Sequence, residues 1–158
     1  MMSCVVETPL GMAHIEGDAK GISAIEVKEE GCVTRDVPKE LKPCADQLHA
    51  YFYGELKAFD LSLNPSGTPF QKKVWRALQN IPFGRTMTYL ELSEELGNVK
   101  AIRAVAAANG KNPLWIVVPC HRVIGSDGSL VGYAGGLGRK QWLLNHERDA
   151  KQMALFDF

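Results

Sequence analysis

The chain has 158 residues, of which 46% are hydrophobic and 23% are charged, as in an ordinary globular protein. This length is enough for one sizeable core or for two small domains. No apolar run approaches the roughly 20 residues that a membrane-spanning helix needs. The N-terminus lacks the basic and apolar regions of a signal peptide, so we expect a cytoplasmic protein with no membrane partner.

The net charge of zero conceals an uneven distribution of charge. Residues 1–64 carry six lysines and arginines against eleven acidic residues, and residues 65–158 carry twelve against seven. The two parts therefore have net charges of −5 and +5. A basic part beside an acidic part is typical of a DNA-binding domain with an acidic neighbour, but chance asymmetry would give the same numbers.

The four cysteines are Cys4, Cys32, Cys44 and Cys120. They form no Cys-x-x-Cys pair, and the four histidines are not spaced around them as zinc ligands would be. We therefore predict no metal and no cofactor, and we expect reduced thiols. The first three cysteines are interpreted as packing or surface residues.

Residues 1–64 predict a small α/β domain. The pattern contains short strand-like runs, a glycine-bounded turn and one helix that Gly54 would end. The predicted elements are strands at 4–7, 12–16 and 22–27, the turn at 17–21, the helix at 43–53 and a closing strand at 59–63. Residues 64–67 predict a linker.

Residues 65–149 predict a mostly helical domain. Thr68 and Thr88 each begin a capping-box pattern, which predicts the start of a helix. The predicted helices run from Thr68 to about Asn80, from Thr88 through Leu96, from 100 to 109 and from 139 to 147.

The second and third of these helices, joined at Gly97-Asn98, match the helix-turn-helix pattern, although a plain helical hairpin has the same spacing. The alanines of the helix at 100–109 cannot hydrogen-bond to base edges. Small side chains permit close approach to a narrow surface, and Arg103 is a long cation available to insert. This pattern favours shape-based contact with a minor groove.

The strongest chemical signal is Pro119-Cys120-His121-Arg122, which follows the apolar run 114–118. The thiolate is the reactive form of cysteine, and a neighbouring imidazole or cation favours it, so Cys120 is a candidate nucleophile. The glycine-rich stretch at 125–138 matches no phosphate-binding loop. It is interpreted as a substrate-pocket loop, with a plain surface loop as the alternative.

Several motifs stand in one order along the chain, and together they resemble one family. They are Gly67 to Gln71, Val74-Trp75, Ile81-Pro82-Phe83-Gly84, Tyr89, Arg103-Ala104-Val105, Asn112-Pro113, Pro119 to Ile124, Gly132 to Gly136, and Leu143-Leu144 with Glu147. Over residues 41–148 the chain is similar to the O6-alkylguanine-DNA alkyltransferases, the methylated-DNA–protein-cysteine methyltransferases. Residues 1–40 match only loosely.

The resemblance implies an α+β fold, with a ribonuclease H-like domain at 1–64, an alkyltransferase domain at 65–149 and a tail at 150–158. It implies direct-reversal repair of duplex DNA, in the nucleoid or in a eukaryotic nucleus. The protein would bind in the minor groove and flip the damaged base out. It would then move the alkyl group irreversibly from O6 of guanine, or O4 of thymine, to Cys120, once per monomer.

The family's site residues map onto this sequence in three groups. The catalytic group is Cys120 as acceptor, His121 as its base through a water, Glu147 as the carboxylate that orients the imidazole, Tyr89 on the departing base, and Asn112 tying the loop before the cysteine. The DNA-binding group is Arg103, Ala104, Thr88 and Lys100. The pocket group is Tyr133, Val123, Trp115, Gly132, Ala134 and Gly135.

Two positions depart from the family pattern. Trp115 stands where many relatives carry a small residue or proline, and at the pocket rim it would narrow access for bulky alkyl groups. Ala134 stands where some relatives have a serine, so a contact to O6 would have to come from the backbone. Arg122 is interpreted as a structural ion-pair partner.

Two other functions share parts of this pattern. A non-catalytic protein that recognises alkylguanine and recruits other repair would carry tryptophan at the cysteine position. A helix-turn-helix regulator with Cys120 as a sensor would need a sequence-reading helix, and the helix at 100–109 supplies few base-reading side chains. The sequence therefore favours alkyl transfer.

The C-terminal residues contain Gln-x-x-Leu-Phe, which resembles the peptide that bacterial replication and repair proteins insert into the sliding clamp. Gln152, Leu155 and Phe156 would be its anchors in a pocket on the partner. A tail that folds back on its own core is the alternative.

Overall fold

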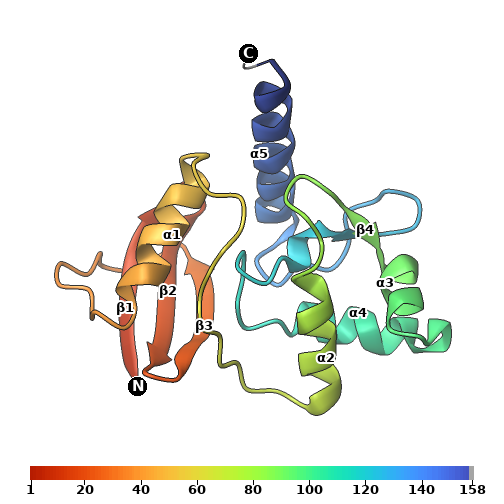
Figure 1. Cartoon of the computed structure of the whole chain (residues 1–158), viewed down its shortest axis with the longest axis horizontal. Coiled ribbons are helices and arrows are strands. Elements are labelled where there is room, and N and C mark those ends of the chain that lie inside the picture. The colour runs from red at the N-terminus through yellow and green to blue at the C-terminus, as the bar shows by residue number, and fades with distance from the viewer. Residues whose placement is uncertain (157–158) are drawn as a thin grey trace. The chain divides into compact units, whose positions relative to one another are not determined.

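The structure, a computed structural model, describes the backbone of residues 1–156 and the side chains of residues 1–150 (Figure 1). Contacts divide the chain into two compact units. Unit 1 contains Met1–Ser66 and Pro113–Val117, and unit 2 contains Gly67–Asn112 and the residues from Val118 onward. The combination of sheet and helices confirms the predicted α+β class. Within the described residues, no helix is long and apolar enough to cross a membrane.

Unit 1 is built on a three-stranded antiparallel sheet of β1 (Met2–Thr8), β2 (Gly11–Asp18) and β3 (Gly21–Lys28), paired in that order. Successive side chains of a strand point to opposite faces, so alternate residues such as Ala13 and Ile15 are fully buried. The helix α1 (Lys42–Phe52) packs against this sheet through its own buried residues (Figure 1). The predicted strands at 4–7, 12–16 and 22–27 and the predicted helix at 43–53 are confirmed.

The predicted closing strand at 59–63 is wrong. Within this segment Leu63 forms a single parallel bridge with Ile22, where the Ile22 amide donates to the Ser62 carbonyl at 2.8 Å, and residues 59–62 are in no strand. The Gln47 side chain explains why: its amide donates to the Asp60 carbonyl and accepts from the Asp60 amide, both at 2.9 Å. The backbone groups of Asp60 are therefore satisfied by a side chain instead of a neighbouring strand.

Unit 2 contains the helices α2 (Pro69–Leu78), α3 (Tyr89–Glu95), α4 (Ile102–Gly110) and α5 (Leu137–Phe156). The capping boxes predicted at Thr68 and Thr88 are both formed. A 3-10 turn, η1 (Val99–Ala101), joins α3 to α4, and both α2 and α3 pack against α4 (Figure 1). The predicted pair of helices with a short turn is therefore present.

The active-site motif lies between short elements of unit 2. The 3-10 helix η2 (Cys120–Arg122) leads directly into β5 (Val123–Ile124), which pairs in parallel with β4 (Met87–Thr88) just before α3. This pairing fixes the cysteine motif next to the start of α3.

The last helix is longer than predicted. It begins at Leu137 and continues to Phe156, although the sequence pattern predicted 139–147. Residues 148–154 contain no glycine or proline, so nothing local stops the helix at Glu147. The side chains of Gln152, Leu155 and Phe156, predicted as partner-binding anchors, lie outside the described residues.

Candidate active site

The segment that leads to Cys120 is anchored on β3, the edge strand of the unit 1 sheet. Residues 113–117 run beside it. The Ile25 amide donates to the Pro113 carbonyl (2.8 Å), and the Trp115 amide donates to the Ile25 carbonyl (3.2 Å). The apolar run before the cysteine is therefore held by backbone hydrogen bonds as well as by burial.

A γ-turn centred on Ile116 bends this segment. The Val117 amide donates to the Trp115 carbonyl at 2.8 Å, and Ile116 has φ +74°. A positive φ is rare for a β-branched residue, and it costs about 1–3 kcal/mol where the surrounding structure imposes it. The buried Ile116 side chain and the sheet anchor therefore hold a strained backbone four residues before the cysteine.

A second γ-turn, centred on Pro119, sets the entry to Cys120. The Cys120 amide donates to the Val118 carbonyl at 2.8 Å, and Pro119 has φ −82° and ψ 63°. The proline ring already restricts φ to this range. The side-chain amide of Asn112 donates to the same Val118 carbonyl at 2.8 Å. Asn112 thus ties the end of α4 to the turn that precedes the cysteine.

The Glu147 carboxylate, 1% exposed, accepts hydrogen bonds from three residues. His121 Nε2 lies 2.7 Å from Oε2, and the Gly84 amide donates to Oε1 at 3.2 Å. Arg122 donates from Nε to Oε1 (2.8 Å) and from Nη2 to Oε2 (3.0 Å), a bidentate charge pair. Arg122 Nη1 also donates to the Ile81 carbonyl at 2.7 Å. Arg122 is therefore the structural ion-pair partner that the sequence suggested.

These contacts fix the protonation of Glu147. Burial would raise the pKa of this carboxyl group, but the hydrogen bonds and charges of His121 and Arg122 outweigh it and hold the pKa well below its ordinary value. Glu147 is therefore ionised at neutral pH.

His121 is fully buried and neutral at rest. Burial lowers the pKa of its imidazole, and the hydrogen bond and charge of Glu147 only partly oppose this effect. An ionised carboxylate accepts hydrogen bonds only, so Nε2 carries the proton that faces Glu147. Nδ1 is then left as a lone pair, and it has no hydrogen-bond partner among the described residues. His121 is arranged to accept a proton at Nδ1.

Cys120 is a protonated thiol in this structure. Burial raises the pKa of its thiol to about 11, and the hydrogen bond from Asn112 and the charge of Lys140 only partly oppose it. A thiol of this kind needs a base to become a nucleophile. The role of His121, its neighbour in sequence, as that base stays a prediction, and the unpartnered Nδ1 is compatible with it.

Tyr89 brings the predicted pocket loop to the start of α3. Its hydroxyl lies 3.1 Å from the Val131 carbonyl oxygen and 3.4 Å from the Gly132 carbonyl oxygen. Gly132 has φ +61°, and a Cβ there would lie 3.3 Å from the Tyr89 hydroxyl, so glycine permits this close approach. Val123 and Tyr133 are both buried. The structure therefore brings Tyr89 and Gly132 together and buries the other two predicted residues.

Lys140 was missed by the sequence analysis. It is fully buried on α5, and its Nζ donates to the Val123 carbonyl (2.5 Å) and to the Val131 carbonyl (2.9 Å). Burial lowers its pKa to about 8, and the thiol of Cys120 acts in the opposite direction. Lys140 stands seven residues before Glu147, two helical turns along one face, and that spacing was a signal for an inward-facing side chain.

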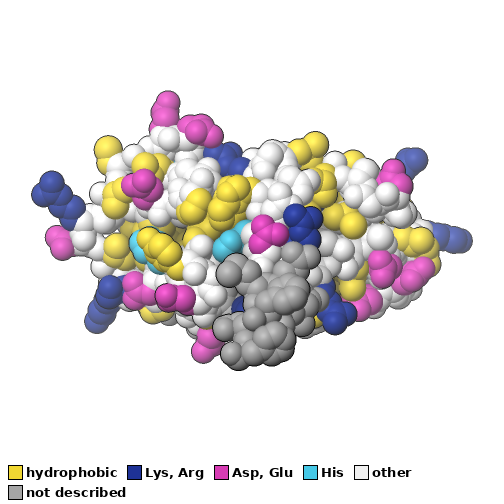
Figure 2. Space-filling model, turned by 90° about the horizontal axis from the view of Figure 1, so that it is seen from above, with side chains coloured by type: hydrophobic (Ala, Val, Ile, Leu, Met, Phe, Trp, Pro, Cys, Tyr) yellow, Lys and Arg dark blue, Asp and Glu magenta, His cyan; other side chains and the backbone are white. Residues whose placement is uncertain are grey.

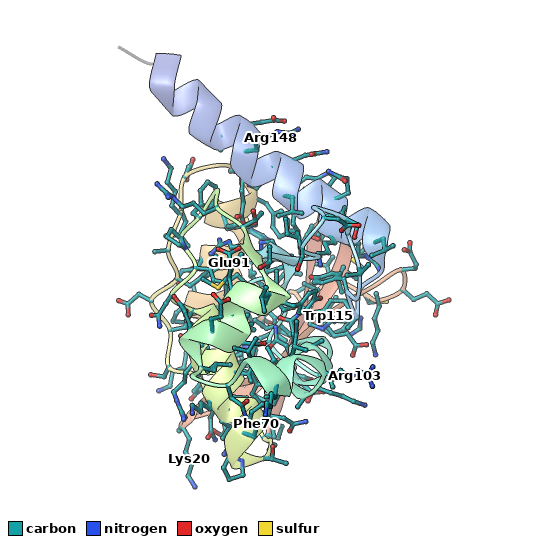
Figure 3. The ribbon with its side chains drawn as sticks, turned by 90° about the vertical axis from the view of Figure 1, so that its right-hand side faces the viewer. Lys20, Phe70, Glu91, Arg103, Trp115 and Arg148 are labelled. Atoms are coloured by element: carbon teal, nitrogen blue, oxygen red, sulfur yellow. The ribbon has the colours of Figure 1, made fainter. Side chains whose placement is uncertain are left out.

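The predicted DNA-binding residues lie on and before α4. Arg103, Ala104 and Lys100 are exposed, and Arg103 is labelled on α4 in Figure 3. The Thr88 hydroxyl accepts from the Glu91 amide in its capping box, so its contact with DNA stays a prediction. On the face shown in Figure 2, acidic and basic side chains are interspersed.

The remaining pocket residues are placed differently. Trp115 is buried and belongs to unit 1, where its backbone pairs with β3, so its predicted place at the pocket rim stays a prediction. Ala134 is exposed, and the Gly135 carbonyl accepts from Arg139 Nη1 at 3.2 Å. Within the described residues, no group of three His, Cys, Asp or Glu side chains could hold a metal ion.

Family models match both parts of the chain. One, described as the ribonuclease-like domain of 6-O-methylguanine DNA methyltransferase, matches residues 1–65. The other, the DNA-binding domain of 6-O-methylguanine DNA methyltransferase, matches residues 69–149. The chain belongs to the 6-O-methylguanine DNA methyltransferase family, as the sequence motifs predicted.

Individual relatives are similar over nearly the whole chain. A methylated-DNA–protein-cysteine methyltransferase of Methanosarcina acetivorans is 46% identical over 154 residues, which cover 93% of this chain and 98% of the relative. The crystal structure of Mycobacterium tuberculosis O6-methylguanine methyltransferase superposes with a TM-score of 0.85 at 40% identity, with 98% of each chain covered. The mycobacterial protein in complex with DNA also has a TM-score of 0.85, at 40% identity, covering 94% of this chain and 93% of that one.

Replacing Glu147 by glutamine tests the buried network. The carboxylate stabilises the fold above its ordinary pKa of 4.5, and this stabilisation is lost as the pH falls below that value, because the folded pKa is depressed. Glu147→Gln leaves Arg122 buried without its counter-charge, so we expect a loss of about 3–5 kcal/mol in the free energy of unfolding at neutral pH. Urea titrations at several pH values measure both effects.

Arg148→Gln, one residue further along α5, is the matched control. Arg148 pairs with Asp149 at 3.6 Å on the surface, and both side chains are more than 60% exposed, so its loss should change the free energy of unfolding by less than about 1 kcal/mol. The difference in the free energy of unfolding between Glu147→Gln and the wild type should become smaller as the pH is lowered below 4.5, because the wild type then loses the stabilisation by its carboxylate. Parallel stability curves for the two proteins would contradict a depressed pKa at Glu147.

Proposed function

We propose that this chain repairs duplex DNA by moving an alkyl group from O6 of guanine, or O4 of thymine, onto Cys120. The observation that carries the proposal is the buried thiol of Cys120 followed by the neutral His121. The Nε2 of His121 is hydrogen-bonded to the ionised Glu147, and its Nδ1 is available to accept a proton. The names of its relatives support the same activity: relatives are called methylated-DNA–protein-cysteine methyltransferases, and the mycobacterial O6-methylguanine methyltransferase was solved in complex with DNA.

The reaction we propose is an in-line displacement. His121 takes the Cys120 proton at Nδ1, through a water as the family resemblance implies, and Glu147 stabilises the imidazolium that results. The thiolate forms the S–C bond while the C–O6 bond breaks, and the electron pair of that bond goes to the guanine. Tyr89 hydrogen-bonds to the departing base and gives it a proton. The products are a thioether and an unmodified guanine.

In this proposal the exposed face of α4 binds the DNA. Ala104 offers a small side chain for close approach to the minor groove, and Arg103 is long enough to fill the stack that the flipped base leaves. Lys100 and Thr88 lie before the helices and would contact phosphates. Tyr133, Val123 and the loop at 132–135 would enclose the flipped base.

The same chemistry makes the protein a single-use acceptor. A thioether is a poor leaving group, and no group described near Cys120 would activate it for release. One protein molecule is therefore consumed per lesion. We propose that it works as a cytoplasmic monomer, with the DNA as its substrate.

Mass measurement tests this function directly. The protein is incubated with a duplex that contains one O6-methylguanine and is then digested. We expect the Cys120 peptide to gain the mass of one methylene unit, with one methyl group per protein molecule. Cys120→Ala should gain nothing, and Cys32→Ser, which removes an exposed thiol, should react like the wild type.

Other outcomes lead to the alternative functions. Tight binding to the methylated duplex without any mass gain would mean a non-catalytic reader. A methyl group on Cys32 instead of Cys120 would contradict the assignment of the acceptor. If the protein neither bound the methylated duplex nor took up a methyl group, the helix-turn-helix regulator would be the remaining hypothesis.

We also propose that the tail at 150–158 docks on a sliding clamp through Gln152, Leu155 and Phe156. The support is the Gln-x-x-Leu-Phe pattern at a chain end, where a short peptide with apolar anchors suits a pocket on another protein. Clamp binding would bring the repair protein to newly copied DNA.

Deletion of residues 152–158 tests the tail. We expect the deletion to abolish binding to a purified bacterial clamp and to leave the methyl-transfer rate unchanged. Leu155→Ala should weaken clamp binding by about tenfold or more, whereas Met153→Ala, between the anchors, should not. Equal clamp binding by the full and the truncated chain would overturn the proposal.

A further inference from the structure

Asn109 is a buried side chain that none of these roles uses. It lies near the end of α4 and is 1% exposed. Its amide nitrogen lies 3.4 Å from the Tyr89 hydroxyl oxygen and 3.5 Å from the Cys120 carbonyl oxygen. One amide therefore links the helix that carries Arg103 to the acceptor cysteine and to the phenol.

Folding stability does not explain an amide at this position. Both contacts of the amide nitrogen are long, and the Asn109 amide oxygen has no hydrogen-bond partner among the described residues. A buried polar atom without a partner costs about 1–3 kcal/mol, and an apolar side chain of similar shape would avoid that cost. Such an atom in a folded protein needs a specific explanation, and here the contact with Tyr89 supplies one.

The partners of Tyr89 set the direction of its hydrogen bonds. The carbonyls of Val131 and Gly132 can only accept, so the Tyr89 hydroxyl donates its proton toward them. The Asn109 amide nitrogen can only donate, so it donates to the Tyr89 oxygen. When hydrogen bonds are linked in series in this way, each one strengthens the next, and the Tyr89 hydroxyl becomes a better donor.

The acidity of Tyr89 follows the same logic. Burial raises the pKa of the Tyr89 phenol, and Cys120, when it is ionised, acts in the same direction. The hydrogen bond from Asn109 opposes them, because it stabilises the phenolate form. Asn109 is thus the neighbour that keeps this phenol able to give up a proton.

Lys140 makes the Tyr89 proton easy to redirect. Its Nζ donates to the Val131 carbonyl at 2.9 Å, the same carbonyl that the Tyr89 hydroxyl faces at 3.1 Å. When the hydroxyl turns to another acceptor, this carbonyl keeps a donor and is not left unpaired. The resting hydrogen bond of Tyr89 therefore does not compete strongly with a bound base.

We propose that Asn109 is a positioning residue for alkyl transfer, which holds the Tyr89 oxygen by donating to it and so directs the phenol proton to the departing base. This inference rests on the function proposed above. As the C–O6 bond breaks, the guanine takes the Tyr89 proton and the Asn109 N–H stabilises the phenolate. The phenolate regains a proton from water, and the imidazolium of His121 releases the thiol proton to solvent. Protons and charge therefore balance over the reaction.

Single-turnover kinetics on a duplex with one O6-methylguanine separate this role from a structural one. Asn109→Leu keeps the branched shape and the number of side-chain heavy atoms, although leucine is larger, and it removes the donor. We expect the transfer rate at saturating DNA to fall by about tenfold or more, since a hydrogen bond to a developing charge is lost. The dissociation constant for the methylated duplex should stay within about twofold, because Asn109 is buried and touches no proposed DNA contact.

Ser93→Ala is the matched control. The Ser93 hydroxyl is buried and donates to the Tyr89 backbone carbonyl at 2.9 Å, so this variant removes a hydrogen bond to the same residue but not one to its phenol. Its transfer rate should match that of the wild type. An equal loss of rate in Ser93→Ala and Asn109→Leu would assign the effect to packing and overturn the proposal.

A double-mutant cycle with Tyr89→Phe decides whether Asn109 acts through the phenol. In the Tyr89→Phe background, Asn109→Leu should cost little further rate, because the group it serves is gone. A full additional loss would overturn the proposal, as would a wild-type rate for Asn109→Leu alone. A wild-type protein that transfers no methyl group would instead defeat the proposed function, before any variant is compared.

Nuclear magnetic resonance measures the pKa of the Tyr89 phenol directly, without an activity assay. Carbon-13 at the Tyr89 Cζ reports the ionisation of the phenol in the DNA-free protein. Asn109→Leu should raise the Tyr89 pKa relative to wild type, whereas Ser93→Ala should leave it unchanged. Identical titration curves for all three proteins would contradict the donor role of Asn109.

Discussion

One buried carboxylate organises the site. Glu147 on α5 accepts hydrogen bonds from two other segments: from the loop at 81–84 through the Gly84 amide, and from the 3-10 helix η2 through His121 and Arg122. A charge removed from water costs several kcal/mol unless a counter-charge and further hydrogen bonds compensate, so these donors are needed together. The compensation fixes α5, the loop and η2 relative to one another, and it orients the imidazole of His121.

The same network decides which groups are charged. Arg122 is the buried counter-charge, and His121 therefore does not need to carry one and stays neutral. A neutral imidazole with one nitrogen committed to Glu147 has one lone pair free for proton transfer. The thiol of Cys120 is buried and protonated, so in the proposed reaction its reactivity depends on this proton acceptor. A site of this kind keeps the acceptor cysteine inert toward other electrophiles until a base is positioned beside it.

Local chemistry explains which features the sequence predicted. The capping boxes at Thr68 and Thr88 depend on residues three positions apart, and both were found where expected. The strand at 59–63 failed because a side chain from another element, Gln47, takes the backbone groups of Asp60. Asn109 carried no sequence signal, since its role depends on contacts 11 and 20 residues away along the chain.

Cys120 in this site is a protonated thiol and not a preformed thiolate, and in the proposed reaction His121 makes it reactive. Its protonation state can be followed through its rate of reaction with iodoacetamide in the DNA-free protein, measured on the Cys120 peptide across pH. A buried thiol should be modified slowly at neutral pH, at a rate that keeps rising toward its pKa of about 11. A fast rate that is already constant at neutral pH would mean a stable thiolate, for which no base is needed.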